Sequence, residues 1–107
     1  MTIDLNRDTY ENEALKSTVP VMVDFWGPLC RPCLALNPAV EKLEKEYDGN
    51  IKIAKVNSAE NRMLCAKLRV IGLPAFVFYK NGAEFKRLAG EQLSENDLRE
   101  AVKAAIA

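Results

Sequence analysis

The order of hydrophobic and polar positions along this chain follows two different periods, and each period predicts a type of element. Residues 21–26 are apolar at every position except Asp24, which is typical of a central strand covered on both faces. Residues 51–56 alternate between apolar and polar, residues 75–79 are continuously apolar, and residues 3–5 carry a shorter alternation. We therefore expect strands in these four segments, with a short edge strand at 3–5.

Apolar residues at helical spacing predict helices between the strands. Asp8 followed three residues later by Glu11 resembles a capping box, which predicts a first helix beginning there. A longer amphipathic helix is predicted before residues 48–50, and its apolar face consists of Leu36, Val40, Leu43 and Tyr47. Because proline interrupts helical hydrogen bonding, we expect Pro38 to kink this helix.

The second half of the chain carries further signals at the ends of its elements. Ser58 can cap a third helix, and Ser94 with the acidic residues after it predicts the start of a terminal helix. Asn81-Gly82 stands between residues 75–79 and 84–88, and this dipeptide is a strong hairpin signal. The last two strands should therefore be antiparallel.

The resulting order, β-α-β-α-β-α-β-β-α, predicts an α/β fold with a mixed sheet of about five strands and helices on both faces. The first β-α-β units require right-handed parallel crossovers, and the hairpin adds an antiparallel edge. In such sheets functional sites lie beyond the carboxyl ends of the strands.

Composition narrows the possible functions. The chain has 107 residues, 49% of them hydrophobic, which suits one compact domain over residues 1–107. Fifteen basic and fifteen acidic residues cancel, there is no histidine and no basic block, so nucleic acid and anionic membranes are poor candidates for partners. The N-terminal residues lack a signal-peptide pattern and no run is long enough for a membrane span, so we expect a cytoplasmic protein.

A C-x-x-C motif follows the predicted central strand directly, at residues 30–33. At a strand-to-helix junction inside a β-α-β pattern, this spacing indicates a thiol/disulfide site. The alternative is a zinc or iron-sulfur centre that adds Cys65, but the chain offers no histidine as a fourth ligand. Otherwise Cys65 is expected to be an inert half-buried thiol on the third helix.

A series of landmarks extends over nearly the whole chain, namely Val23-Asp24-Phe25-Trp26, Cys30-x-Pro32-Cys33, Pro38, Lys55-Val56-Asn57, Gly72-Leu73-Pro74, Lys80-Asn81-Gly82 and Gly90. In their order and closely in their spacing, these landmarks resemble those of the thioredoxin family. The resemblance implies a thioredoxin fold and a dithiol/disulfide oxidoreductase. Three positions depart from the family pattern, because Leu29 replaces a tryptophan, Arg31 a glycine and Ala75 a threonine.

The residues around the motif suggest how this chemistry would proceed. Cys30 stands at the start of a helix, where the helix dipole favours a thiolate, and the adjacent Arg31 should lower its pKa further. Pro32 suits the first helical turn, and Cys33 would resolve the mixed disulfide. Asp24, a carboxylate in an apolar strand, should have a raised pKa and act as the proton acceptor for Cys33 through water.

The resemblance assigns the remaining site residues. It places Lys55 on the strand next to Asp24, where it could tune the carboxylate. It implies a cis peptide at Leu73-Pro74, with the Leu73 backbone free to pair with an extended substrate. The expected substrate-binding surface around Cys30 comprises Trp26, Gly27, Pro28, Leu29, Ile71, Gly72, Leu73, Pro74 and Gly90. Trp26 could equally be a core residue.

The resemblance also implies partners. Disulfide-containing proteins would be the substrates of a monomer that binds no cofactor, and a thioredoxin-reductase-like donor would supply electrons. Three alternatives remain open from the residues alone, namely a metal-binding module, a thioredoxin-fold adaptor without redox turnover, and an oxidase or isomerase whose potential is set by Arg31.

Overall fold

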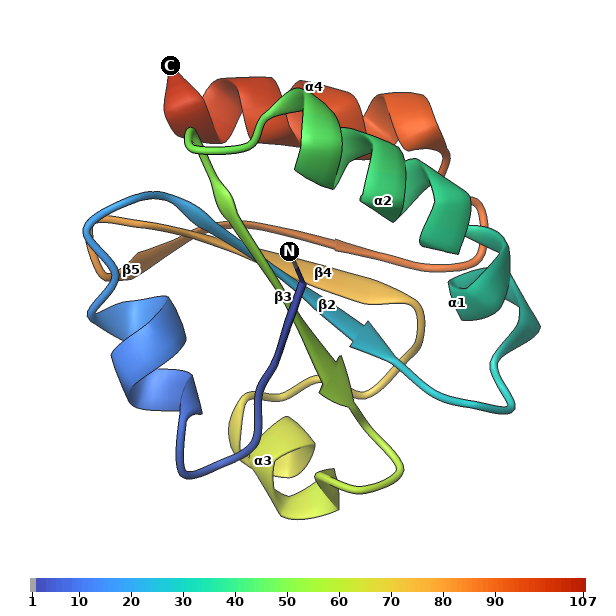
Figure 1. The fold of residues 1–107 in the computed structure, drawn as a ribbon. Coiled ribbons are helices and arrows are strands. Elements are labelled where there is room, and N and C mark those ends of the chain that lie inside the picture. The colour runs from blue at the N-terminus through green and yellow to red at the C-terminus, as the bar shows by residue number, and fades with distance from the viewer. Residues whose placement is uncertain (1) are drawn as a thin grey trace.

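The computed structural model describes residues 2–107, which are built around a five-stranded mixed sheet (Figure 1). Its strands are β1 (Ile3–Asp4), β2 (Val21–Trp26), β3 (Lys52–Asn57), β4 (Ala75–Lys80) and β5 (Ala83–Ala89). They lie in the order β1-β3-β2-β4-β5; β1, β3 and β2 are parallel, whereas β4 and β5 run antiparallel to their neighbours. The mixed sheet and the central position of the apolar strand are both confirmed.

Helices cover both faces of the sheet (Figure 1). The π-helical segment η1 (Glu11–Leu15) and α3 (Arg62–Lys67) pack on one face. On the other face lie α2 (Asn37–Glu46) and α4 (Glu95–Ile106), and α1 (Arg31–Ala35) directly precedes α2. Among residues 2–107, no helix is long and apolar enough to cross a membrane.

The alternation of β2 divides the interior into two cores, because successive side chains of a strand point to opposite faces. Val21, Val23 and Phe25 belong to the core beneath η1 and α3, whereas Met22 packs with α2 and α4. Asp24 therefore shares the face of Met22, and its carboxyl group lies on the side of the sheet that α2 covers.

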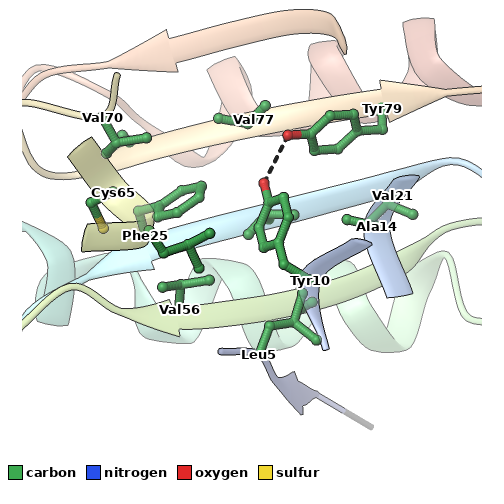
Figure 2. Packing of buried hydrophobic residues seen from close by; sticks show 14 residues of the cluster. Leu5, Tyr10, Ala14, Val21, Phe25, Val56, Cys65, Val70, Val77 and Tyr79 are labelled. Carbon is green, nitrogen blue, oxygen red and sulfur yellow. Dashed lines mark hydrogen bonds between the residues drawn. The ribbon is translucent and has the colours of Figure 1, made fainter. Parts of the chain in front are cut away.

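The core beneath η1 and α3 contains a hydrogen-bonded tyrosine pair (Figure 2). The hydroxyl oxygens of Tyr10 and Tyr79 are 2.8 Å apart, and the two rings meet edge to face. Burial raises the pKa of both phenols. The pair satisfies two polar groups inside an apolar cluster and thereby fixes η1 against β4.

Two predicted turns and caps are confirmed. Asn81 and Gly82 both have positive φ, 55° and 80°, as the tight turn between β4 and β5 requires. Ser94 accepts a hydrogen bond from the Asp97 N–H, and the Asp97 carboxylate accepts one from the Ser94 N–H, which completes a capping box for α4.

Two other predicted caps are wrong. The turn before η1 is capped by Asn6, whose Oδ1 accepts hydrogen bonds from the N–H groups of Asp8 and Thr9 at 2.8 and 3.1 Å. Asp8 therefore donates its N–H to the capping residue and is not itself the cap. Ser58 lies too early to cap α3, because a turn separates β3 from the first helical residue, Arg62.

The kink expected at Pro38 is present as a break between two helices. The predicted long helix is divided at Leu36, so that α1 ends at Ala35 and α2 begins at Asn37. Pro38 then occupies the first turn of α2, where its missing N–H costs no helical hydrogen bond. The break makes the segment that carries the cysteines a separate short helix.

Candidate active site

The C-x-x-C motif lies where β2 leaves the sheet and α1 begins. Cys30 is the N-cap of α1, and its N–H donates to the carbonyl of Gly27 at 3.1 Å. The Cys33 N–H points back at the Cys30 sulfur, with 3.2 Å between nitrogen and sulfur. A sulfur in this position accepts a hydrogen bond from an otherwise unpaired helical N–H, which favours negative charge on Cys30 when the pair is reduced.

The two cysteines form a disulfide and differ in exposure. Their Cα atoms are 5.3 Å apart, within the normal range for a disulfide. Cys33 is only 3% exposed, whereas Cys30 is half-buried and faces the surface. Pro32 stands in the first turn of α1 between them. A partner molecule can therefore reach Cys30 while Cys33 stays covered.

A shallow, mostly apolar groove of about 420 Å³ opens at Cys30. Its lining consists of Gly27, Pro28, Leu29, Cys30, Ser58, Ala59 and Leu73. Three separate loops meet here, and Gly27 permits the approach, because a Cβ on it would lie 3.3 Å from Leu73 Cδ1. The groove brings the redox loop and the segment before Pro74 together.

The segment preceding β4 is positioned from two sides. The Leu73-Pro74 peptide is cis, and the Pro74 carbonyl accepts the N–H of Gly90 at 3.0 Å. The Leu73 N–H and C=O make none of the backbone hydrogen bonds among residues 2–107. An extended chain entering the groove would therefore find an unpaired backbone donor and acceptor.

Two large aliphatic side chains stand almost free in solvent beside this segment and the redox loop. Leu29 is 96% exposed and Ile71 is 99% exposed. Neither contributes to either core. Leu29 lines the groove at Cys30, and Ile71 precedes the groove residue Leu73 by two positions, so both side chains are available to apolar groups of a bound molecule.

Asp24 is the one buried charged residue among the described residues, at 3% exposure. Burial raises the pKa of its carboxyl group to about 7, and the nearby Lys55 opposes part of that shift. Phe76 is its register partner on β4, and Lys55 is its register partner on β3. A carboxyl group with a pKa near 7 can both accept and release a proton at neutral pH.

The ammonium group of Lys55 makes its hydrogen bond elsewhere. Lys55 Nζ donates to Asn37 Oδ1 at 3.1 Å, at the first residue of α2. Among residues 2–107, no ion pair within 4.0 Å joins Lys55 to Asp24. Lys55 thus acts on the carboxyl group through its charge and not through direct contact.

The third cysteine is remote from this site. Cys65 is 6% exposed and packs within the core beneath η1 and α3 (Figure 2). Within residues 2–107, no three histidine, cysteine, aspartate or glutamate side chains are grouped as metal ligands. The geometry of the donor groups therefore favours the dithiol interpretation of the motif.

Comparison with known proteins decides between the remaining interpretations. The sequence model of thioredoxins matches residues 1–104. The chain belongs to the thioredoxin family. With its Cys30–Cys33 disulfide, this thioredoxin family member is a thiol-disulfide oxidoreductase that acts as a protein-disulfide reductase.

Similar thioredoxins come from bacteria and a plant. A thioredoxin of Acetoanaerobium sticklandii is 36% identical over 103 residues, which are 96% of this chain and 98% of that protein. Thioredoxin 1 of Nostoc sp. is 37% identical over 82 residues, 77% of either chain. The chloroplastic M-type thioredoxin of Spinacia oleracea is 37% identical over 87 residues, 81% of this chain and 48% of that protein.

The fold places some of the expected substrate-binding residues together and others apart. Gly27, Pro28, Leu29 and Leu73 line the groove at Cys30. Trp26 instead lines a neighbouring hollow, whose other residues are Asp4, Leu5, Asn6, Asn57, Glu60 and Asn61. Pro74 is buried, and Gly72 is exposed outside the groove lining.

Three residues of the site escaped sequence reasoning. Ser58 and Ala59 line the groove because the Ser58 N–H donates to the carbonyl of Trp26 at 2.8 Å, which brings the end of β3 beside the redox loop. Asn37 was missed because its role depends on Lys55, which is eighteen residues away in sequence. No local sequence pattern around Pro38 signals this contact.

Proposed function

We propose that Cys30 is the nucleophile and Cys33 the resolving thiol in the reduction of protein disulfides. The observation that carries this assignment is the difference in exposure between the half-buried Cys30 at the groove and the covered Cys33. The Cys30 thiolate attacks one sulfur of a substrate disulfide, forms a mixed disulfide and releases one substrate thiol. The Cys33 thiolate then attacks the Cys30 sulfur, which releases the second substrate thiol and leaves the Cys30–Cys33 disulfide. Two electrons and two protons pass to the substrate in total.

Asp24 is proposed to accept the proton of Cys33 through water. Support comes from its place on the face of β2 that α2 covers, and from its pKa of about 7, which burial raises. A base with a pKa near the working pH is most effective in proton transfer. Lys55 is proposed to tune this carboxyl group through its charge.

The substrate is proposed to be an extended protein segment around a disulfide. It would pair with the unbonded backbone of Leu73 and lay apolar side chains against Leu29 and Ile71. Leu29 and Arg31 depart from the family pattern beside Cys30, so we expect them to set the choice of partner.

Electrons for the next cycle are proposed to come from an external thioredoxin-reductase-like donor, since the reaction itself leaves the disulfide form. We further propose that the protein works in the cytoplasm as a monomer, without a bound cofactor. The net charge of zero and the lack of a basic block support protein partners over nucleic acid or membranes.

A trapping experiment tests the order of the two cysteines. A Cys33→Ser protein should accumulate mixed disulfides through Cys30, because no second thiol remains to release the substrate. The measurement is recovery of disulfide-linked complexes from a lysate, with the bound proteins released by reductant and identified by mass spectrometry. This also names the substrates and the donor.

The matched control is the Cys30→Ser/Cys33→Ser protein, which should capture nothing above background. Equal capture by a Cys30→Ser protein that retains Cys33 would reverse the assignment of the two thiols.

Replacing Arg31 by glycine should make this thioredoxin family member a stronger reductant. Arg31 is exposed, and its guanidinium makes no hydrogen bond or ion pair with another residue of 2–107, so its charge is not neutralised locally. Its loss should raise the Cys30 thiol pKa by about half a unit, the exposed charge being partly screened. The potential should become more negative by roughly 15 mV. Alkylation rate against pH and equilibration with glutathione measure the two effects, and an Arg31→Lys protein should keep most of both wild-type values.

A further inference from the structure

Asp24 and Lys55 are placed to form an ion pair, yet the lysine is held away from one. They are register partners on the parallel strands β2 and β3, so their side chains leave the same face of the sheet. The four-carbon stem of a lysine is long enough to bring its ammonium to a neighbouring carboxylate. Instead, Lys55 Nζ donates to Asn37 Oδ1 at 3.1 Å in a half-buried setting.

Asn37 is well placed to hold that ammonium group. It is the first residue of α2, directly after the break at Leu36, and is followed by Pro38. The break orients the first turn of α2 over the sheet face that carries Asp24 and Lys55. A neutral amide oxygen can accept the lysine hydrogen bond without neutralising its charge.

We propose that Asn37 is a positioning residue of the redox reaction, which anchors Lys55 at the start of α2 and keeps its ammonium out of direct contact with the Asp24 carboxyl group. The inference rests on the proposed role of Asp24 as the proton acceptor for Cys33. Through this anchor the charge of Lys55 acts at a distance, and the carboxyl group keeps a proton affinity suited to neutral pH.

The physical reason lies in how steeply an ion pair changes a carboxyl group. Direct contact with a cation lowers a carboxyl pKa by about 1–3 units, which would leave Asp24 a weak base at neutral pH. Burial currently dominates, and Lys55 is the charged side chain that opposes it from β3. Phe76, opposite Asp24 on β4, does not titrate. Lys55 is the charged residue whose field acts on Asp24, and Cys33, which is buried in α1, is the thiol whose proton Asp24 is proposed to accept.

The test compares the Asp24 carboxyl pKa in four proteins by carbon-13 NMR titration, namely wild type, Asn37→Ala, Lys55→Gln and the double variant. Asn37→Ala should release Lys55 toward Asp24 and lower the pKa of Asp24 by about one unit, a tenfold loss of proton affinity. In the Lys55→Gln background the same substitution should leave the pKa in place. Asn96→Ala, on the exposed side of α4, is the control and should change nothing.

Two results would overturn the proposal. One is an unchanged Asp24 pKa in a folded Asn37→Ala protein. The other is an equal shift with and without Lys55. Should Asn37→Ala fail to fold, Asn37→Ser takes its place in the same comparison, because the serine hydroxyl is too short to reach the position of the Asn37 Oδ1 atom. The Asp24 pKa should then fall when Lys55 is present and stay unchanged in the Lys55→Gln background, and an unchanged pKa with Lys55 present would overturn the proposal.

The pH profile of the resolving step separates this inference from the function on which it rests. If Asn37→Ala lowers the Asp24 pKa but does not change the pH profile of the resolving step, then Asp24 takes no part in the proton transfer, whereas the anchoring role of Asn37 still holds. If the Asp24 pKa is unchanged in Asn37→Ala and the resolving step is slow in an Asp24→Asn protein, then Asn37 has no positioning role, whereas Asp24 is still the proton acceptor.

Discussion

A Cys30→Ser protein is expected to lose disulfide reductase activity by at least about 10³-fold. The serine hydroxyl is a far weaker nucleophile at neutral pH than a thiolate at the start of α1, and it cannot form a mixed disulfide. Cys33 cannot take over, because it is covered at 3% exposure. Reduction of a model protein disulfide driven by dithiothreitol measures the loss.

The matched control is Cys65→Ala, which removes a thiol from the core beneath η1 and α3, away from the groove. It should keep wild-type turnover at a temperature where it is folded. Wild-type turnover by the Cys30→Ser protein would contradict the mechanism, whatever its stability.

The parts of the fold that the sequence predicted well depend on local signals. Residues 21–26 are apolar at every position except Asp24, which favours a central strand covered on both faces. The turn at Asn81-Gly82 demands positive φ at both positions, and asparagine and glycine tolerate it best. Ser94 caps α4 through a bond to a residue three positions away. In each case the sequence signal lies within a few residues.

The parts that escaped prediction depend on contacts distant in sequence. Ser58 was predicted to cap a helix. In the fold its N–H donates to the Trp26 carbonyl at the end of β2, and a turn separates it from α3, which begins at Arg62. The bond from Lys55 to Asn37 crosses from the sheet to α2, and no local pattern encodes it. The buried carboxyl group was predictable as an oddity in an apolar strand, whereas the size of its pKa shift required the fold.

Asp24→Asn is expected to stabilise the protein above pH 7 while it slows the resolving step. In the folded protein the Asp24 pKa rises from 3.8 to about 7, chiefly because of burial. Between these two values the folded state holds a proton that the unfolded state has released, so the stability of the wild type falls as the pH rises. The stability that the Asp24 proton gives to the folded wild type is fully present below about pH 4 and lost above pH 7. The pKa shift corresponds to a change of about 4 kcal/mol in the free energy of unfolding. Asparagine carries no charge at any pH, but its amide must also find partners, so we expect a gain of roughly 2–4 kcal/mol at pH 8.5.

Urea unfolding of wild type and of Asp24→Asn, each in the disulfide form, at pH 4, 5.5, 7 and 8.5 measures this gain. The difference in unfolding free energy between the two proteins isolates Asp24, because every other titrating group is common to both. The difference should be smallest at pH 4 and grow until about pH 7. A difference that is constant with pH would show that Asp24 titrates near its ordinary value and is not a neutral-pH proton acceptor. If the gain appears while resolution of the mixed disulfide keeps its wild-type rate, then the buried carboxyl group destabilises the fold without serving the proton transfer, and Cys33 must lose its proton directly to water.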